Sequence, residues 1–435
     1  MSTTAKTGRE QKVFYGWVVV VACFAITATL SGVSYCFGVF LKSLEIEFNL
    51  SRAVISSIFS TNMVFYGFFA VMGGGLLDRS GPRIVVLLMG LLTGVSLFLT
   101  SRTGVAWQLF LTYGVLLAMG TGPGYTVVMG TTSRWFNRKR GLALGIVGSA
   151  AGFGTLVGSP VVGFLIQQVG WRTAYIVMGV FTCAVVIPAS RLVRKDPAEI
   201  GEFPDGSKSD RVEINKKVAG VESIPQIDGF SLREASRTGD FWLFGSIWFL
   251  ASSCYFLALT HIVPHATDMG ISALRAAAIL SLIGGGNVIG KLVLGRISDT
   301  VGRKMTAVLC VLAGAGVMAG LSWSEHLVAL YLCGFVWGFS FGGFDTAVVA
   351  MVGDIFGLRR IGVIMGTLCI PWGIGAAAGS TLGGLIFDFT HTYFIAFLAG
   401  AIAMLALALL IALVAHNESR TVTETGTSGL DSDKP

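Results

Sequence analysis

Long apolar runs, separated by short polar turns, follow one another along almost the whole chain. They cover residues 14–40, 53–77, 84–102, 105–133, 141–168, 172–192, 241–265, 273–295, 305–323, 327–352, 361–387 and 391–415. As a helix, about 20 apolar residues cross the hydrocarbon core of a bilayer. A transmembrane barrel would instead show weak alternating segments of about ten residues. The pattern therefore predicts an all-α membrane protein with twelve transmembrane helices.

The longest polar stretch, residues 193–240, divides these runs into two groups of six. It contains the segment EFPDGSKSDRV, in which apolar residues show no periodicity. Such a stretch is typical of a linker rather than of a packed element. We expect a tail at 1–13, a six-helix half at 14–192, a linker at 193–240, a second six-helix half at 241–415 and a tail at 416–435.

Composition excludes several classes of protein. Of the 435 residues, 53% are hydrophobic and only 13% are charged, which is too apolar for a soluble enzyme. The seven cysteines all fall in apolar runs, without metal-ligand spacing, so we expect packing residues rather than disulfides or a metal site. A phosphate-binding GxxxxGK[ST] loop and a catalytic cluster are both missing from the sequence. We therefore expect neither an enzyme nor an ATP-driven pump, and no cofactor.

The basic residues predict an orientation in the membrane. With the N-terminus inside, few of the 31 Lys and Arg residues fall in outer loops, namely Lys42, Arg52, Arg102, Arg172 and Arg275. The positive-inside rule then places both termini and the linker in the cytoplasm of a cell with a bacterial-type inner membrane. Because topology accounts for the basic loops, we expect a lipid bilayer and no nucleic acid as partner.

Two short motifs recur at nearly the same interval along the chain. GGGLLDRSGPR at 73–83 is repeated as LGRISDTVGRK at 294–304, so that Asp299 corresponds to Asp78. FNRKR at 136–140 is repeated as FGLRR at 356–360, at an interval that differs by a single position. Duplicated halves are typical of alternating-access transporters, in which one half rocks against the other around a central site.

The first of these motifs resembles the G-x-x-x-D-R-x-G-R-R pattern of the major facilitator superfamily. The matching residues are Gly74, Asp78, Arg79, Gly81 and Arg83 in the first copy and Gly295, Asp299, Gly302, Arg303 and Lys304 in the second. The resemblance implies that the charged residues of both copies form a conformational latch between the halves, since a carboxylate there accepts hydrogen bonds from backbone N–H groups and basic side chains. A solvated turn that only orients the protein is the alternative.

Within that superfamily the chain is similar to the monocarboxylate transporters and the bacterial oxalate/formate antiporters. The likeness rests on YGW at 15–17, RWFNRKRGLALG at 134–145 and the stretch at 287–299. The second segment resembles the signature Y-F-x-K-R-x-L-A-x-G of that family. This resemblance implies small organic acids as substrates.

Lys291 is a basic residue inside a predicted span, where a charge is costly and normally faces a cavity or a partner. In the resembled families this position holds an arginine that binds the substrate carboxylate. Lysine replaces the planar fork of arginine with a point charge that still binds a monoanion. Asn287, one helical turn earlier, could donate to the same carboxylate. A lysine that snorkels to the interface and an asparagine that only packs between helices are the alternatives.

Asp345 is the acidic residue that we place deep in a span, at a depth similar to that of Lys291. Our hypothesis is that Asp345 neutralises Lys291 in the empty carrier and releases it when an anion or a proton arrives. An acid satisfied by backbone or water is the alternative.

His261, His265 and Asp268 share one face of the seventh predicted helix, at i, i+4 and i+7. Because histidine titrates near neutral pH, this face could carry a proton. The resemblance also places His261 at the position of a substrate-site histidine in a bacterial lactate transporter of the family. For His265 and Asp268, a role at the outer interface without transport chemistry is the alternative.

Tyr125 follows Pro123 in a glycine-rich stretch, GTGPGYTVV, that breaks easily as a helix. The resemblance implies a substrate-site tyrosine here, and a core tyrosine is the alternative. Cys369, Pro371 and Trp372 mark a flexible point in the eleventh predicted helix. Oxalate/formate carriers have a second basic residue in that region, and this sequence has none. A dicarboxylate is disfavoured because its second charge would lack a partner.

Together these features predict a monomeric secondary carrier for a small monocarboxylate, such as lactate, pyruvate or formate, that moves with a proton. If Lys291 and Asp345 neutralise each other, a carboxylate adds one negative charge, which a co-transported proton would cancel. Exchange for another organic anion would cancel it equally well. The sequence also leaves room for an exporter of drug-like compounds, favoured by the 30 phenylalanines, and for a membrane sensor that binds carboxylates without moving them.

Overall fold

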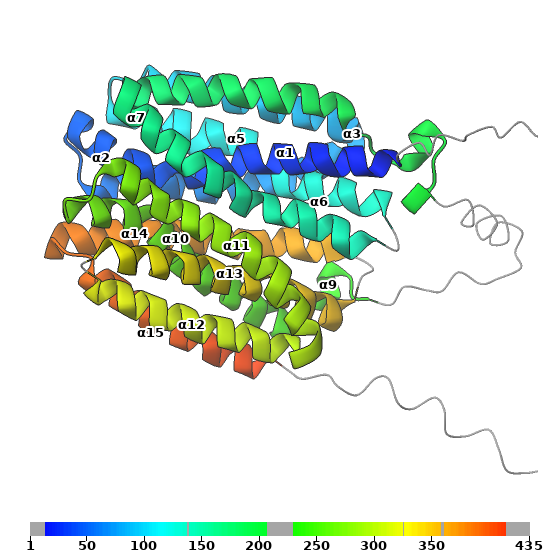
Figure 1. Cartoon of the computed structure of the whole chain (residues 1–435). Helices are drawn as coiled ribbons and strands as arrows, with labels where there is room; N and C mark the ends of the chain where they lie inside the picture. Colours follow the sequence, from blue (N-terminus) through cyan, green and yellow to red (C-terminus); the bar gives the residue numbers. More distant parts are fainter. Residues whose placement is uncertain (1–13, 137–138, 207–228, 325, 358–360, 415–435) are drawn as a thin grey trace, which may run out of the picture.

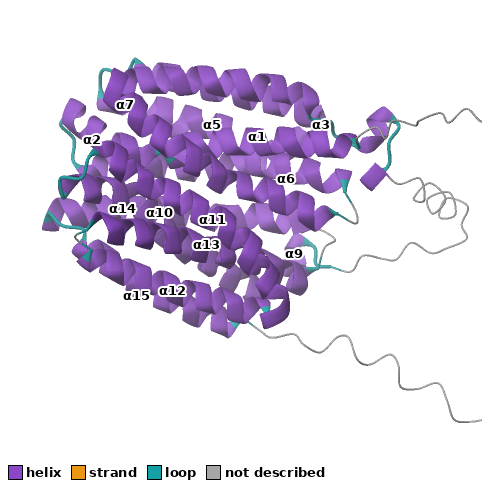
Figure 2. Cartoon of the chain, in the orientation of Figure 1, coloured by secondary structure: helices purple, strands orange, loops and turns teal. Residues whose placement is uncertain are grey.

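The structure is a computed structural model of the chain, and it describes residues 14–136, 139–206, 229–324, 326–357 and 361–414. This described part is almost entirely helical and contains no strand (Figure 2). Its helices of 12 or more residues are α1 (Tyr15–Tyr35), α2 (Phe37–Phe48), α3 (Arg52–Ser101), α6 (Gly124–Trp135), α7 (Arg140–Leu192), α10 (Gly239–Asp268), α11 (Ala273–Val301), α12 (Arg303–Trp323), α13 (Leu327–Phe356), α14 (Ile361–Thr390) and α15 (Phe394–Leu413). The shorter ones are α4 (Ala106–Leu109), a π-helical segment (Phe110–Leu116), α5 (Leu117–Thr121), α9 (Leu232–Ala235) and 3-10 segments at Pro197–Ile200 and Pro204–Gly206.

Ten helical segments of the described part are long and apolar enough to cross a membrane. α1 and α2 together form one of them, Tyr15–Phe48, and α3 provides two, Arg52–Leu77 and Arg79–Ser101, on either side of a turn at Gly81. One of them, α7, turns at Gly170 (φ 78°) and crosses twice. The remaining crossing runs from Ala106 to Trp135 and consists of four short helical pieces, none of which spans a membrane alone. The described part therefore has the twelve crossings that the sequence predicts, and the predicted fold class is confirmed.

The turns of the backbone repeat at the interval that separates Asp78 from Asp299. Positive φ angles, which L-residues other than glycine adopt at a cost, occur in three pairs at that same interval: Asn49 and Gly270, Gly81 and Gly302, and Gly170 and His391. Each pair ends the same crossing in the two groups of helices. The two groups are therefore alike in backbone as well as in motif.

Both ends of the described chain lie at one end of the bundle. There α1 begins, α7 ends, α10 begins and α15 ends, at the right in Figure 1. We call this end the terminal face. The opposite end, where α2 is followed by α3 and α10 by α11, is called the distal face.

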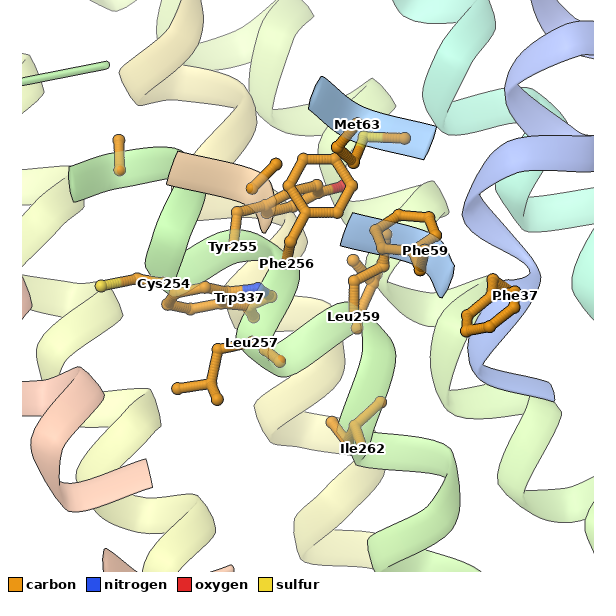
Figure 3. Close-up of a cluster of buried hydrophobic side chains, with 14 of the residues drawn as sticks. Phe37, Phe59, Met63, Cys254, Tyr255, Phe256, Leu257, Leu259, Ile262 and Trp337 are labelled. Carbon is orange, nitrogen blue, oxygen red and sulfur yellow. The ribbon is translucent and has the colours of Figure 1, made fainter. Parts of the chain in front are cut away.

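The two groups of helices, α1 to α7 and α10 to α15, meet along two seams. One seam joins the first crossing of α3 to α14, and the other joins the first crossing of α7 to α11. An apolar core of buried side chains lies between them (Figure 3). Its rings cross from one group to the other, with Phe59 of α3 lying 5.6 Å from Phe256 of α10 and 5.3 Å from Phe37 of α2, between ring centroids.

Candidate functional site

The seam between α7 and α11 is tightly packed from the distal face to the middle of the bundle. Glycine allows this approach, since a Cβ on Gly152 would lie 2.7 Å from the carbonyl oxygen of Gly284, and one on Gly163 would lie 2.9 Å from the Cβ of Ala277. Gly145 and Gly141 lie two and three turns from Gly152, on the same face of α7. There an added Cβ would meet no atom within 4 Å. The seam therefore ends within the first crossing of α7.

The seam between α3 and α14 has the same form. A Cβ on Gly384 would lie 2.7 Å from the carbonyl oxygen of Arg52, and one on Gly373 would lie 2.7 Å from that of Met63. Gly366 and Gly362 continue the same face of α14 toward the terminal face, and a Cβ on either would meet nothing within 4 Å. The two groups of helices thus touch at the distal face and separate toward the terminal face.

Lys291 lies where the first seam ends. Its Nζ donates to the carbonyl oxygen of Gly148 in α7 at 3.2 Å and lies 2.8 Å from Oδ2 of Asp345 in α13. The side chains of Lys291 and Asp345 remain 19% and 30% exposed, so the pair is partly accessible although it lies in the middle of two spanning helices. Asn287 is 5% exposed and packs in the seam, close to Gly152. The structure thus brings Lys291, Asp345 and Asn287 together.

Three tyrosines and a cysteine lie near the carboxylate of this ion pair. Tyr35 of α1, Tyr125 of α6, Tyr255 of α10 and Cys369 of α14 all lie within electrostatic range of the Asp345 carboxylate. Tyr125, one of the predicted site residues, is 38% exposed. It lies at the start of α6, directly after the break that Pro123 makes. Side chains from these four helices, two in each group, therefore lie near Asp345.

Aromatic rings extend this region toward the other seam. The ring of Tyr255 stacks on Phe341 with 3.9 Å between centroids. Trp372 of α14 lies 5.1 Å from Phe256 and 6.1 Å from Tyr66 of α3, again between centroids. Tyr66 in turn lies within electrostatic range of Tyr35 and Tyr125. We call Tyr35, Tyr66, Tyr125 and Tyr255 the tyrosine cluster.

Sequence reasoning identified one member of the tyrosine cluster and missed Tyr35, Tyr66 and Tyr255. These three stand in apolar runs just as Tyr113 and Tyr175 do, and the latter two are fully buried core residues. Hydropathy does not distinguish the two kinds of tyrosine. A signal is present only in the family pattern around Tyr125.

A second polar network joins the two groups of helices at the distal face, centred on Arg52. Its guanidinium is 3% exposed and donates to Asp268 at 2.5 and 2.8 Å, to Glu45 at 3.2 and 3.3 Å and to the Tyr393 hydroxyl at 2.9 Å. It also lies 3.8 Å above the ring of Phe387. We call Arg52 and these partners the distal network. Sequence reasoning singled out Asp268 but missed Arg52, because hydropathy assigns Arg52 to a loop.

Two further charged residues of the distal face support this network. Lys42 lies 2.5 Å from Asp268 and shares that carboxylate with Arg52. Asp388 of α14 accepts hydrogen bonds from the backbone N–H groups of Arg52 and Ala53, at 3.1 and 2.9 Å. The first backbone N–H groups of a helix have no partner within it and carry partial positive charge. A carboxylate from the second group of helices therefore caps the start of α3.

His261 lies in this network and not beside Lys291. It is fully buried, with Nε2 at 2.8 Å from the carbonyl oxygen of Ser380 and Nδ1 at 3.1 Å from the Tyr393 hydroxyl. Because a carbonyl only accepts, Nε2 carries the hydrogen, and Nδ1 accepts from Tyr393. A neutral imidazole satisfies every one of these contacts. The structure thus joins His261 and Asp268 through Arg52 and Tyr393, and separates them from Asp345.

The predicted latch residues contact their own group of helices. Arg83 donates to the carbonyl oxygen of Val193 at 3.1 Å, and Arg303 pairs with Asp354 and lies 4.0 Å from Asp299. Arg79 is exposed, and the side chain of Asp78 lies outside the described part of the structure. The structure does not bring the described residues of the two copies together, as expected where the groups are apart.

Comparison with known proteins gives three findings. The family model described as Major Facilitator Superfamily matches residues 23–344 and 284–431. Monocarboxylate transporter 13 of Bos taurus is 26% identical over 403 residues, which cover 92% of this chain and 89% of the relative. Monocarboxylate transporter 12 of Homo sapiens is 26% identical over 415 residues, which cover 90% of this chain and 78% of the relative.

Among solved structures, a bacterial homologue of the human lysosomal transporter Spinster has a similar fold. Its crystal structure, in an inward-facing and unoccupied conformation, superposes with a TM-score of 0.70 at 13% identity. The match covers 94% of this chain and 96% of that one. At this identity the likeness concerns the fold alone.

Proposed function

Because this chain belongs to the major facilitator superfamily, as a membrane transporter and not an enzyme, we propose that it carries small monocarboxylates across a cell membrane by alternating access. The similarity to monocarboxylate transporters supports the class of substrate. The pair of Lys291 and Asp345, 2.8 Å apart at the point where the two halves separate, carries the proposal. A cation at that point is placed to meet an anion that enters between the halves.

In this proposal the two halves are residues 14–192 and 241–415, and the terminal face is cytoplasmic, as the distribution of Lys and Arg predicts. The tight distal seams and the open face of Gly141, Gly145, Gly362 and Gly366 then correspond to an inward-facing state. The predicted latch residues of the two copies approach one another only when the cytoplasmic side closes. The carrier works as a monomer, because both seams and the central pair belong to one chain.

The charges in the centre suggest how transport is coupled to protons. In the empty carrier, Asp345 neutralises Lys291. A substrate carboxylate takes the place of Asp345 on Lys291, and Asp345 then takes up a proton, so that the loaded centre is again neutral. A net charge in the interior of a membrane protein is expensive. The neutral loaded and neutral empty states are therefore the ones that can rearrange.

In this proposal the residues that sequence reasoning grouped together have different tasks. Lys291 binds the carboxylate, with Asn287 positioning α11 against α7 beside it. Tyr125 contacts the substrate, and Asp345 carries the proton. His261 and Asp268 belong to the distal network, which has to open before the site can face the other side of the membrane.

Uptake into proteoliposomes tests this proposal. The purified protein is reconstituted without internal substrate, and labelled lactate or pyruvate is added with a pH gradient imposed across the membrane. We expect uptake that follows the gradient in wild type and is lost in Lys291→Ala. The matched control is Arg275→Ala, which removes a positive charge from the exposed distal end of the same helix. Transport that survives in Lys291→Ala would remove Lys291 from the site.

The same assay separates symport from anion exchange. Uptake that ignores the pH gradient and requires a carboxylate inside the vesicle would identify an exchanger. That result would leave the carboxylate site in place and contradict the proton-carrying role of Asp345.

A further inference from the structure

The hydroxyl groups of the tyrosine cluster have no hydrogen-bond partner among the described residues. Tyr35, Tyr66, Tyr125 and Tyr255 belong to α1, α3, α6 and α10, and no described protein group satisfies their phenols. The chain's serine and threonine hydroxyls, in contrast, repeatedly bond to a carbonyl of the preceding helical turn, as Thr61 and Thr182 do. The four phenols are therefore polar groups left available in the middle of a membrane protein.

Leaving a polar group unpaired in the interior costs about 1–3 kcal/mol unless water or a ligand satisfies it. Four such hydroxyls come from both halves, and those of Tyr35, Tyr125 and Tyr255 lie within electrostatic range of Asp345. Water can satisfy them in the empty carrier, at little entropic cost. A ligand that offers its own hydrogen-bonding oxygens replaces that water when it binds.

The position of these hydroxyls sets the length of the ligand. Lys291 belongs to the seam between α7 and α11, whereas Tyr66 and Trp372 belong to the seam between α3 and α14. α11 and α14 are not packing neighbours in the described part of the chain. Formate or acetate held by Lys291 would leave the Tyr66 side of the interior empty. A ligand that uses both ends of the site has to be extended.

Aromatic rings connect the two ends of the site. Tyr255 stacks on Phe341 and lies 5.3 Å from Phe256, which in turn lies 5.1 Å from Trp372, between ring centroids. Such rings bind an alkyl chain or another ring through a large contact area. Charge is provided at one end of the site only, since Lys291 is the cation beside Asp345.

We propose that the preferred substrate is an extended hydroxy- or oxo-monocarboxylate. Its carboxylate binds Lys291, its carbon skeleton lies against Tyr255, Phe341 and Trp372, and an oxygen remote from the carboxylate accepts or donates hydrogen bonds with the tyrosine cluster. This inference rests on the proposed function, because it takes Lys291 as the carboxylate site.

Binding of matched ligand pairs to the purified full chain tests the inference, with calorimetry as the readout. The pairs are 3-phenylpropionate with 3-(4-hydroxyphenyl)propionate and hexanoate with 6-hydroxyhexanoate, and acetate is the short probe. A site built to bond a hydroxyl rejects the analogue that lacks it. We expect the hydroxylated member of at least one pair to bind about tenfold more tightly than its partner, and acetate to bind most weakly.

Substitution by phenylalanine removes only the hydroxyl and keeps the ring. In Tyr66→Phe or Tyr125→Phe we expect the hydroxylated ligand to lose about tenfold in affinity while the deoxy ligand is unchanged. Folding should be intact, since neither hydroxyl bonds to a described protein group. The control is Tyr175→Phe, which removes a hydroxyl that is also unpaired but fully buried in the core of the first half. Tyr175→Phe should change neither the affinity for the hydroxylated ligand nor the affinity for the deoxy ligand.

Equal affinities within both pairs in wild type would overturn the inference, as would a preference that persists in all four Tyr→Phe variants of the cluster. Tight binding of acetate with no binding of the longer acids would overturn it as well. These results leave the proposed function standing as long as Lys291→Ala abolishes carboxylate binding. Binding that is unchanged in Lys291→Ala contradicts the proposed function instead.

Discussion

The first crossing of α3, Arg52–Leu77, and α11, Ala273–Val301, are the same element of the repeat with opposite placement of charge. Both follow a left-handed turn, at Asn49 and Gly270. At the interval of the repeat, Arg52 at the start of α3 corresponds to Ala273, and Lys291 in the middle of α11 corresponds to Ala70. One backbone thus carries a cation at its end in one half and in its centre in the other.

The two cations also differ in how many partners hold them. Arg52 is buried, stacks on an aromatic ring and donates to two carboxylates and a hydroxyl from both halves. Lys291 has one carboxylate, from its own half, and one carbonyl across the seam. Breaking the first set requires the halves to part, whereas the second pair can exchange partners with the halves in place. We infer that Arg52 holds a conformation and Lys291 handles the substrate.

Among the changes that test this difference between the two cations, removing the Arg52 side chain should have the largest effect. Arg52→Ala leaves the Asp268 carboxylate, which is 27% exposed, with Lys42 as its remaining partner. Losing these hydrogen bonds between charged groups costs about 3 kcal/mol. We expect a lower unfolding temperature and faster hydrogen exchange of the first amides of α3, measured by mass spectrometry.

Arg172→Ala is the matched control for that experiment. Arg172 also pairs with an acid near the distal face, Glu47, at 3.0 Å, but both residues belong to the first half. Its loss should destabilise that half without opening the seam. If both variants raised the hydrogen exchange of the first backbone amides of α3 equally, the distal network would not be what holds the halves together.

A methyl group at the seam should have the next largest effect. In Gly384→Ala the new Cβ would lie 2.7 Å from the Arg52 carbonyl and 2.8 Å from Ala53, both backbone contacts that cannot move aside easily. Overpacking of this kind costs about 2 kcal/mol. This contact exists only while the two halves touch at the distal face, in what we call the distal-closed state. The variant should therefore shift the carrier toward the state that is open at the distal face. The distance between spin labels on α2 and α10 measures that shift.

Gly366→Ala, on the same face of the same helix, provides the comparison. Its Cβ would meet no atom within 4 Å in this conformation, and alanine favours a helix over glycine by roughly 1 kcal/mol. We expect the distal-closed state to be retained or favoured. Equal behaviour of the two alanine variants would contradict the asymmetric closure described above.

Much of the fold follows from local features of the sequence. Apolar runs, basic loops and a repeated motif are properties of short segments, and they predict twelve crossings in two groups. The interruption of the crossing at 106–135 by a π-helical segment is not visible in hydropathy, because it depends on the register of backbone hydrogen bonds. Only the glycines and Pro123 hint at it.

The functional residues also include some that the sequence reveals and some that it does not. Lys291 and Asp345 can be found because a charge in an apolar run is rare, and counting residues along each helix puts them at equal depth. The distal network cannot be found like this. Arg52, Asp268, Asp388 and Tyr393 stand at the ends of runs, where charges are ordinary, and their contacts join residues that are far apart in the sequence.

Neutralising Asp345 should have a smaller effect, confined to binding. Asp345→Asn keeps the shape of the side chain but leaves Lys291 without an anion. A substrate then no longer competes with Asp345, so we expect affinity to increase by about tenfold, roughly 1.4 kcal/mol. Uptake should lose its dependence on the pH gradient. Asp240→Asn, at the start of α10, removes the same charge outside the centre and should leave both properties unchanged.

The smallest effect that still distinguishes the seam from the interior of a half concerns one hydroxyl. Ser60 of α3 is 8% exposed and bonds across the seam to the carbonyl oxygen of Ala377 and to Thr381, both at 2.7 Å. Ser60→Ala should weaken the distal-closed state by about 1 kcal/mol.

Ser96→Ala removes a buried hydroxyl that bonds at the same distance to Thr112, within the first half. Because that bond persists when the halves part, Ser96→Ala should lower the unfolding temperature without changing the distance between the spin labels. If Ser60→Ala also left that distance unchanged, the seam between α3 and α14 would not be one of the surfaces that separate during transport.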